Sequence, residues 1–202
     1  MNYGLYYDYR KIGDVLIILF DATLESNHEE KNGNVVALFH DDKLVGINIY
    51  EISKIIKIKA KGFIPSINEK ILDVINTILL NANLEPLQMI KNSGYVVARI
   101  NEVEDHPTNK KLKVCKLNID DAVPLQVVSG LDNIRENLLC VCALPFAFLP
   151  NRKQMIPYSA EGVDSCGVIC TPKDLQFKVP DSDNKAFELD ETYSVGIDFW
   201  KY

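Results

Sequence analysis

Four lysines fall within seven positions near the middle of the chain: Lys110, Lys111, Lys113 and Lys116. Arg152 and Lys153 stand side by side further along. Cationic groups gathered in this way neutralise phosphates, and that neutralisation supplies most of the free energy of nucleic-acid binding. The lysine cluster therefore indicates a candidate phosphate-binding site; the alternative is an ordinary solvated loop.

The cysteines and histidines do not form a pattern that predicts catalysis or metal binding. The five cysteines are an odd number and include no Cys-x-x-Cys pair, and the three histidines are scattered. Cys140 and Cys142 alternate with apolar residues, which is typical of buried small side chains. A hydrolase or transferase that uses His106 with Asp105 and one cysteine is the remaining enzymatic alternative. No motif indicates the necessary convergence, so we expect no catalytic residue, no metal and no cofactor.

The net charge of −6 argues against nucleic-acid binding until its distribution is considered. Residues 1–90 carry 9 basic and 12 acidic side chains, residues 91–178 carry 11 and 10, and residues 179–202 carry 2 and 6. The middle block, which contains the lysine cluster, is thus the least acidic part. The longest apolar run near the start, 15–20, is far shorter than the about 20 residues of a membrane helix, and no signal-peptide pattern is present. We expect a cytoplasmic protein with no membrane partner.

The first half of the chain predicts an α+β domain over residues 1–90. Apolar and β-branched stretches at 15–20, 35–40, 44–50 and 55–60 are separated by turn signals, which is typical of antiparallel strands. From Ser66 the apolar spacing becomes helical, with Glu69 as a capping-box partner, and the pattern ends at 81–83. An antiparallel sheet with one helix packed on it follows.

The second half, 91–202, predicts an all-β domain. Strands are expected at 95–104, 112–119, 125–129, 138–144 and 167–171, and a proline and a glycine within 85–94 suit the linker before them. Five short strands match the OB-fold, a partly open barrel that binds oligonucleotides, although other small barrels fit the pattern as well. The segment 189–199 is expected to add an outer strand.

Three ordered blocks carry a family resemblance across residues 94–176. They are 98–117 with its His106-Pro107 pair and following lysines, 126–135, and 162–175. They resemble the tRNA-binding domain of methionyl-tRNA synthetase tails, the phenylalanyl-tRNA synthetase β subunit and EMAP-II-like proteins. The whole arrangement is similar to free-standing bacterial tRNA-binding proteins of the YtpR type. The resemblance implies an OB-fold that binds tRNA or other structured RNA without catalysis.

The resemblance and the cation pattern together give a set of predicted RNA-binding residues. They lie on the first strand of the barrel, on its first and third connections, at the last strand and on nearby loops: Arg99, Asn109, Lys110, Lys111, Lys113, Asn133, Arg135, Arg152, Lys153, Ser165 and Lys173. Several of them have a structural alternative, such as a turn-stabilising Asn133 or a structural Ser165. Glu161 departs from the family, because it stands where a basic residue is expected and would repel phosphate.

The domain has few aromatic residues, which favours recognition of folded RNA by shape and backbone contacts over stacking of single strands. The competing prediction is a protein-interaction module that docks on a synthetase or another RNA-handling protein. The acidic total and Glu161 favour that alternative. The resemblance also suggests a homodimer and an aminoacyl-tRNA synthetase as partners.

Overall fold

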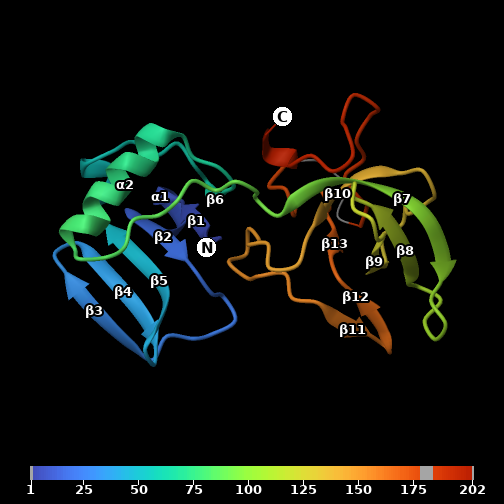
Figure 1. Ribbon diagram of the computed structural model, residues 1–202, viewed down its shortest axis with the longest axis horizontal. Helices are drawn as coiled ribbons and strands as arrows, with labels where there is room; N and C mark the ends of the chain where they lie inside the picture. Colours follow the sequence, from blue (N-terminus) through green and yellow to red (C-terminus); the bar gives the residue numbers. More distant parts are fainter. Residues whose placement is uncertain (1, 178–183, 202) are drawn as a thin grey trace. The chain divides into compact units, whose positions relative to one another are not determined.

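The computed structural model describes residues 2–177 and 184–201, which form two compact units (Figure 1). The first unit comprises residues 1–93 together with 148–154, and the second comprises 94–147 and 155–202. Each unit has its own hydrophobic core. A short loop from the second half of the sequence, 148–154, is therefore part of the first unit.

The first unit is a six-stranded antiparallel sheet with one long helix packed on it. The sheet has the strand order β3-β4-β5-β2-β1-β6. In chain order, the strands and helices of the unit are β1 (Gly4–Tyr7), α1 (Tyr9–Ile12), β2 (Val15–Leu19), β3 (His28–Asn32), β4 (Val35–His40), β5 (Lys43–Tyr50), η1 (Ile52–Lys54), β6 (Gly62–Ile64) and α2 (Glu69–Asn81). The buried face of α2 (Leu72, Ile75 and Leu79) joins Leu16 and Ile47 of the sheet in one core. The predicted α+β architecture is confirmed.

Several local predictions for this unit were wrong or incomplete. The segment 55–60 forms no strand, and strands β1, β3 and β6 were not predicted. Strand β3 is polar and exposed at every position, so it carries no hydrophobic signal. The cap of α2 is Asn68, whose side chain accepts a hydrogen bond from the backbone N–H of Ile71, and not Ser66. Asn is an equally good N-cap, which explains the shift of the helix start by two residues.

The second unit is the predicted OB-fold. Its sheet has the order β13-β10-β7-β8-β9 and consists of β7 (Tyr95–Asp105), β8 (Lys113–Asn118), β9 (Leu125–Ser129), β10 (Leu139–Ala143) and β13 (Val168–Ile169). All pairings are antiparallel. The barrel interior holds the inward residues of these strands, among them Ile100, Leu117 and Val127. A two-stranded hairpin that was not predicted, β11 (Tyr158–Ala160) and β12 (Val163–Ser165), precedes β13.

Hydrogen bonds between β9 and residues 165–166, at the end of β12, nearly close the barrel. The backbone N–H of Cys166 donates to the carbonyl of Gln126 at 2.9 Å. The hydroxyl of Ser165, which is completely buried, accepts from the backbone N–H of Val128 at 3.0 Å and donates to the carbonyl of Gly167. A side chain at Gly167 would meet Cys142 Sγ at 3.0 Å and the Ala143 carbonyl at 3.1 Å, so the close approach requires glycine.

The C-terminal segment lies along the barrel without forming the predicted outer strand. It makes isolated bridges, Glu188 with Cys140 and Asp198 with Val96, and ends in η2 (Phe199–Lys201). These two isolated bridges hold the segment against β10 and β7.

All five cysteines are free, and four of them are buried. Burial raises the pKa of Cys115 to about 11 and that of Cys142 to about 12, and it raises the pKa values of Cys140 and Cys170 as well. The expected burial of Cys140 and Cys142 is confirmed. In the part of the chain that the structure describes, no cluster of His, Cys, Asp and Glu could hold a metal ion, and no helix has the length and apolarity to cross a membrane.

We predict that Ser165→Ala destabilises the second unit. The substitution leaves the buried N–H of Val128 without its acceptor, which costs about 1–3 kcal/mol. Urea unfolding followed by intrinsic fluorescence measures the loss. Ser159→Ala, on the exposed strand β11, is the matched control and should change the unfolding free energy by less than about 0.5 kcal/mol. Equal stability of both variants would contradict the role of Ser165 in closure.

A second prediction concerns thiol reactivity. Only thiolate reacts rapidly with disulfide reagents, and the four buried thiols are both protected and of high pKa. Native protein should show one fast-reacting thiol, Cys166, and denatured protein should show five. Titration with a chromogenic disulfide, with Cys166→Ser as the control, counts them. Any fast-reacting thiol in the native Cys166→Ser variant would contradict the described core.

Candidate nucleic-acid interface

The connection between β7 and β8, residues 106–112, is anchored by the imidazole of His106. This side chain is 4% exposed. Its Nδ1 accepts hydrogen bonds from the backbone N–H groups of Thr108 at 3.3 Å and Asn109 at 3.2 Å, while Nε2 lies 3.0 Å from the carbonyl of Ala160. Because backbone N–H groups can only donate, Nδ1 must be the unprotonated nitrogen, and Nε2–H donates to Ala160. A neutral ring thus fixes the start of the loop.

The turn of the β11–β12 hairpin holds the same loop from the other side. The Glu161 carboxylate accepts from Asn109 Nδ2 at 2.8 Å and from Thr108 Oγ1 at 3.3 Å. Asn109 Oδ1 in turn accepts from the backbone N–H of Lys111 at 3.0 Å. Glu161, the acidic residue that departs from the family pattern, therefore has a structural function, since it links the hairpin to residues 106–112, which we call the lysine loop.

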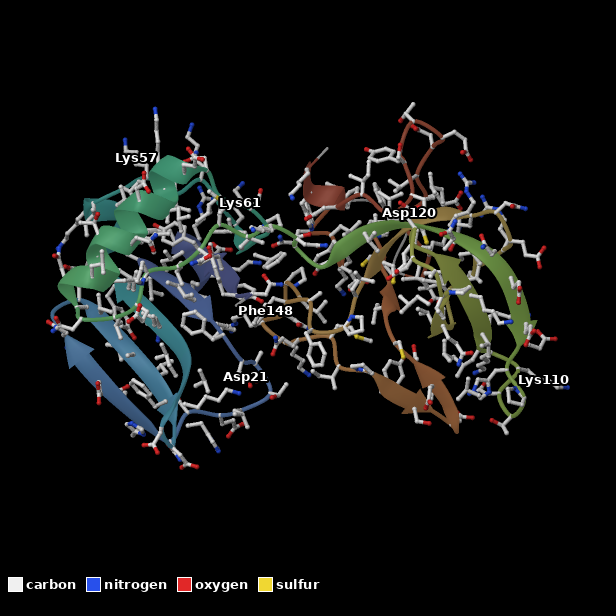
Figure 2. All side chains as sticks on the ribbon, in the orientation of Figure 1. Asp21, Lys57, Lys61, Lys110, Asp120 and Phe148 are labelled. Atoms are coloured by element: carbon white, nitrogen blue, oxygen red, sulfur yellow. The ribbon has the colours of Figure 1, made fainter. Side chains whose placement is uncertain are left out.

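The four clustered lysines differ in how their charges are used. Lys113 pairs with Asp105, and Lys116 pairs with Glu102 at 2.6 Å. The Lys113 ammonium lowers the pKa of Asp105, and Glu102 raises the pKa of Lys116. Lys110 and Lys111 are exposed and have no ion-pair partner among the residues that the structure describes. Figure 2 shows Lys110 pointing outward from the tip of the loop.

Comparison with known proteins gives matches over both units. The family described as "Putative tRNA binding domain" matches residues 95–198, and a domain of unknown function matches residues 22–88. The "Putative tRNA-binding protein YtpR" of Bacillus subtilis is 30% identical over 198 residues, which cover 96% of this chain and 98% of that protein. The chain belongs to this tRNA-binding-domain family.

Other members of the tRNA-binding-domain family are much longer than this chain. The phenylalanine–tRNA ligase β subunit of Methylococcus capsulatus is 34% identical over 110 residues, which are 54% of this chain and 14% of that subunit. The β subunit of Paramagnetospirillum magneticum is 36% identical over 104 residues, or 51% of this chain and 13% of the subunit. Only the region of the binding domain is shared with these synthetase subunits.

Two arginines of the predicted site are paired with the C-terminal segment. Arg99 forms a bidentate pair with Glu191, at 3.0 and 2.6 Å, and Arg135 forms one with Glu188, at 3.0 and 2.8 Å. Hydrogen bonds from Arg135 and Asn133 lower the pKa of Glu188 to about 2. Asn133 also bonds to the backbone of Ala186 in both directions. These three predicted residues therefore hold the C-terminal segment in the described structure.

The remaining predicted residues lie apart from the lysine loop. Arg152 and Lys153 are exposed in the segment 148–154, which belongs to the first unit. Lys173 is exposed on the turn that follows β13. Ser165, which was also predicted to contact RNA, lies in the barrel closure, where its hydroxyl is completely buried. Of the predicted set, the structure brings Asn109, Lys110, Lys111 and Lys113 together.

Sequence reasoning missed the residues that hold the lysine loop. His106 was considered as part of the His106-Pro107 pair and of the enzymatic alternative, and Glu161 only as a departure from the family. The hydrogen bond from His106 to Ala160 spans 54 positions, and that from Asn109 to Glu161 spans 52. Contacts at such separations leave no periodic signal. A histidine before a proline in an otherwise polar stretch was the one local hint.

We predict that His106→Ala loosens this loop. The change leaves two backbone N–H groups and one carbonyl without partners, which costs about 1–3 kcal/mol. Amide hydrogen exchange at Thr108 and Asn109 should accelerate at least tenfold, while exchange in the β7–β10 core should change only in proportion to the lost stability.

His28→Ala is the matched control, because His28 is exposed on β3 in the first unit. It should leave exchange at Thr108 and Asn109 unchanged. Unaltered exchange of these two amides in His106→Ala would show that the imidazole does not hold the loop.

Proposed function

We propose that this protein binds tRNA without catalysis, through the 106–112 loop of its OB-fold. The observation that carries the proposal is the presentation of two cations, Lys110 and Lys111, that have no ion-pair partner among the described residues. They lie on a loop anchored by His106 and Glu161 in a tRNA-binding-domain family member. The name of the Bacillus subtilis relative, which the chain matches nearly end to end, supports the same ligand.

The anchoring of the 106–112 loop favours binding, because little conformational entropy of its backbone remains to be lost when RNA binds. Fixing a flexible backbone costs about 1–2 kcal/mol per residue, and the side-chain bonds of His106 and Asn109 have already fixed this one. Lysine ammonium groups contact phosphate as point charges and carry no base readout. The expected mode is therefore recognition of a folded RNA backbone, with strong dependence on salt.

The chemistry of the described residues supports binding over catalysis. Both ring nitrogens of His106 are used by the main chain, so neither can act as a general base. The four buried thiols have raised pKa values, the opposite of what a nucleophile needs. The enzymatic alternative built on His106, Asp105 and a cysteine thus has no support from this geometry.

The test compares unpaired with paired lysines. Lys110→Gln/Lys111→Gln should weaken tRNA binding about tenfold at about 50 mM salt and reduce the slope of log K against log salt by about 1.5–2. Lys113→Gln/Lys116→Gln is the control, because it removes the same number of positive charges from neighbouring strand positions. In this variant the carboxylates of Asp105 and Glu102 lose their ion-pair partners. Fluorescence anisotropy with total tRNA at several salt concentrations gives both quantities.

The pattern of loss decides the proposal. A smaller reduction in salt slope for the paired set supports the loop as the contact surface. Equal reductions would indicate a diffuse electrostatic effect, and an unchanged affinity in Lys110→Gln/Lys111→Gln would overturn the loop as the site. Equal affinity of the wild-type chain for tRNA and duplex DNA would overturn selective binding of tRNA.

A protein-interaction module is the second candidate function, and the pairing of the cations favours it. Arg99, Arg135, Lys113 and Lys116 are all neutralised by carboxylates of the same unit. A surface that is neutral over most of its extent is better suited to a protein than to RNA. Recovery of a synthetase with the tagged chain, after nuclease treatment and without bound RNA, would favour this function.

A further inference from the structure

The first unit contains a second group of lysines, in a part of the chain that the predicted RNA site does not include. Between Glu51 and Glu69 the sequence has four lysines and no acidic residue, although residues 1–90 are acidic overall. Three of the four alternate with Ile58 and Ala60, at positions 57, 59 and 61. We call Lys57, Lys59 and Lys61 the lysine row.

The structure places the lysine row on one side of its segment. Ile56, Ile58 and Ala60 are partly buried against the core of the first unit, and the three lysines between and after them are exposed. Strict alternation of buried and exposed positions is the signature of an extended backbone, in which every second side chain has the same direction. Figure 2 shows Lys57 and Lys61 on the surface of the unit, near α2.

Among the described residues the lysine row has no ion-pair partner, in contrast to Lys43 and Lys54 of the same unit. Lys43 pairs with Asp21 and Lys54 pairs with Glu51, each at 2.6 Å. The three lysines of the row have no hydrogen-bond or ion-pair partner within residues 2–177 and 184–201. The unit thus keeps a local concentration of three free positive charges in spite of a surplus of carboxylates elsewhere.

We propose that the lysine row is a second RNA-contact surface, which binds successive phosphates of an RNA backbone. Neighbouring lysines of the row are two extended residues apart, about 7 Å, a spacing similar to that of consecutive phosphates along one strand. Cations in a line match a linear polyanion, whereas a single phosphoryl ligand would require donors that converge. The proposal rests on the proposed function, because it assigns the row to the same RNA.

The row adds to affinity by multivalency. The two units belong to one chain. An RNA molecule that is bound by the 106–112 loop is therefore present at a high effective concentration near the row, provided that the RNA is long enough to reach it. Three phosphate contacts correspond to a salt slope of about 2–3. This gives the first unit, which matches a domain of unknown function, a part in RNA binding.

The decisive experiment is lysine footprinting on the full chain. The protein is acetylated briefly with an amine-reactive ester, with and without saturating tRNA, and modification is read at each lysine by mass spectrometry. Bound tRNA should reduce modification of Lys57, Lys59 and Lys61 at least threefold. Lys11 and Lys31 are also exposed lysines of the same unit outside the row, and their modification should not change.

The footprint separates the two proposals. Protection of the row together with Lys110 and Lys111 supports both. Protection of Lys110 and Lys111 alone overturns the row and leaves the proposed function standing. Protection of the row alone supports it and overturns the loop. Protection at neither place overturns both.

Affinity gives an independent measure. Lys57→Gln/Lys59→Gln/Lys61→Gln should weaken tRNA binding roughly tenfold at about 50 mM salt and lower the salt slope by about 2–3. Arg10→Gln/Lys11→Gln/Lys31→Gln removes the same charge from exposed positions of the same unit and should lower affinity less than threefold. An equal effect of the two variants would overturn the row as a contact surface.

Discussion

The geometry of the lysine loop depends on the closure of the OB-fold barrel between β9 and the end of β12. The Cys166 N–H and the Ser165 hydroxyl fix the hairpin β11–β12 against β9. The hairpin then carries the Ala160 carbonyl and the Glu161 carboxylate to the 106–112 loop, where they hold His106 and Asn109. A single seam of hydrogen bonds therefore positions residues that are more than 50 places apart in the sequence.

Charge pairing sorts the cations of the second unit into two groups. Those on strands or next to the C-terminal segment have carboxylates within reach, and bidentate Arg–carboxylate geometry is the strongest of these arrangements. Those at the tip of the 106–112 loop have none among the described residues, and the Glu161 carboxylate that contacts this loop is bonded to Asn109 and Thr108. The fold thus leaves Lys110 and Lys111 as the cations of this loop that remain available to a ligand.

The sequence allowed prediction of elements with a strong hydrophobic period and failed where that period was weak. Strands β2, β4, β5 and β7 to β10 and helix α2 were found because apolar residues mark their buried faces. Strand β3 and the hairpin β11–β12 are short or polar, so nothing in their composition distinguishes them from loops. The lysine loop was visible as a cluster of like charges. The residues that hold this loop were not visible, since Asn109 and Glu161 are separated by 52 positions and His106 and Ala160 by 54.

The wrong prediction of a strand at 55–60 has a physical explanation that bears on function. An alternation of apolar and polar residues requires only a surface against which every second side chain packs. Ile56, Ile58 and Ala60 pack against the core of the first unit, although their segment forms no strand. The exposed positions between and after them carry lysines about 7 Å apart. At that distance in water two ammonium groups repel each other by about 0.6 kcal/mol, and salt screens this further. The free protein can tolerate so small an electrostatic repulsion between neighbouring lysines. The phosphates of an RNA strand bound along the row would compensate for it.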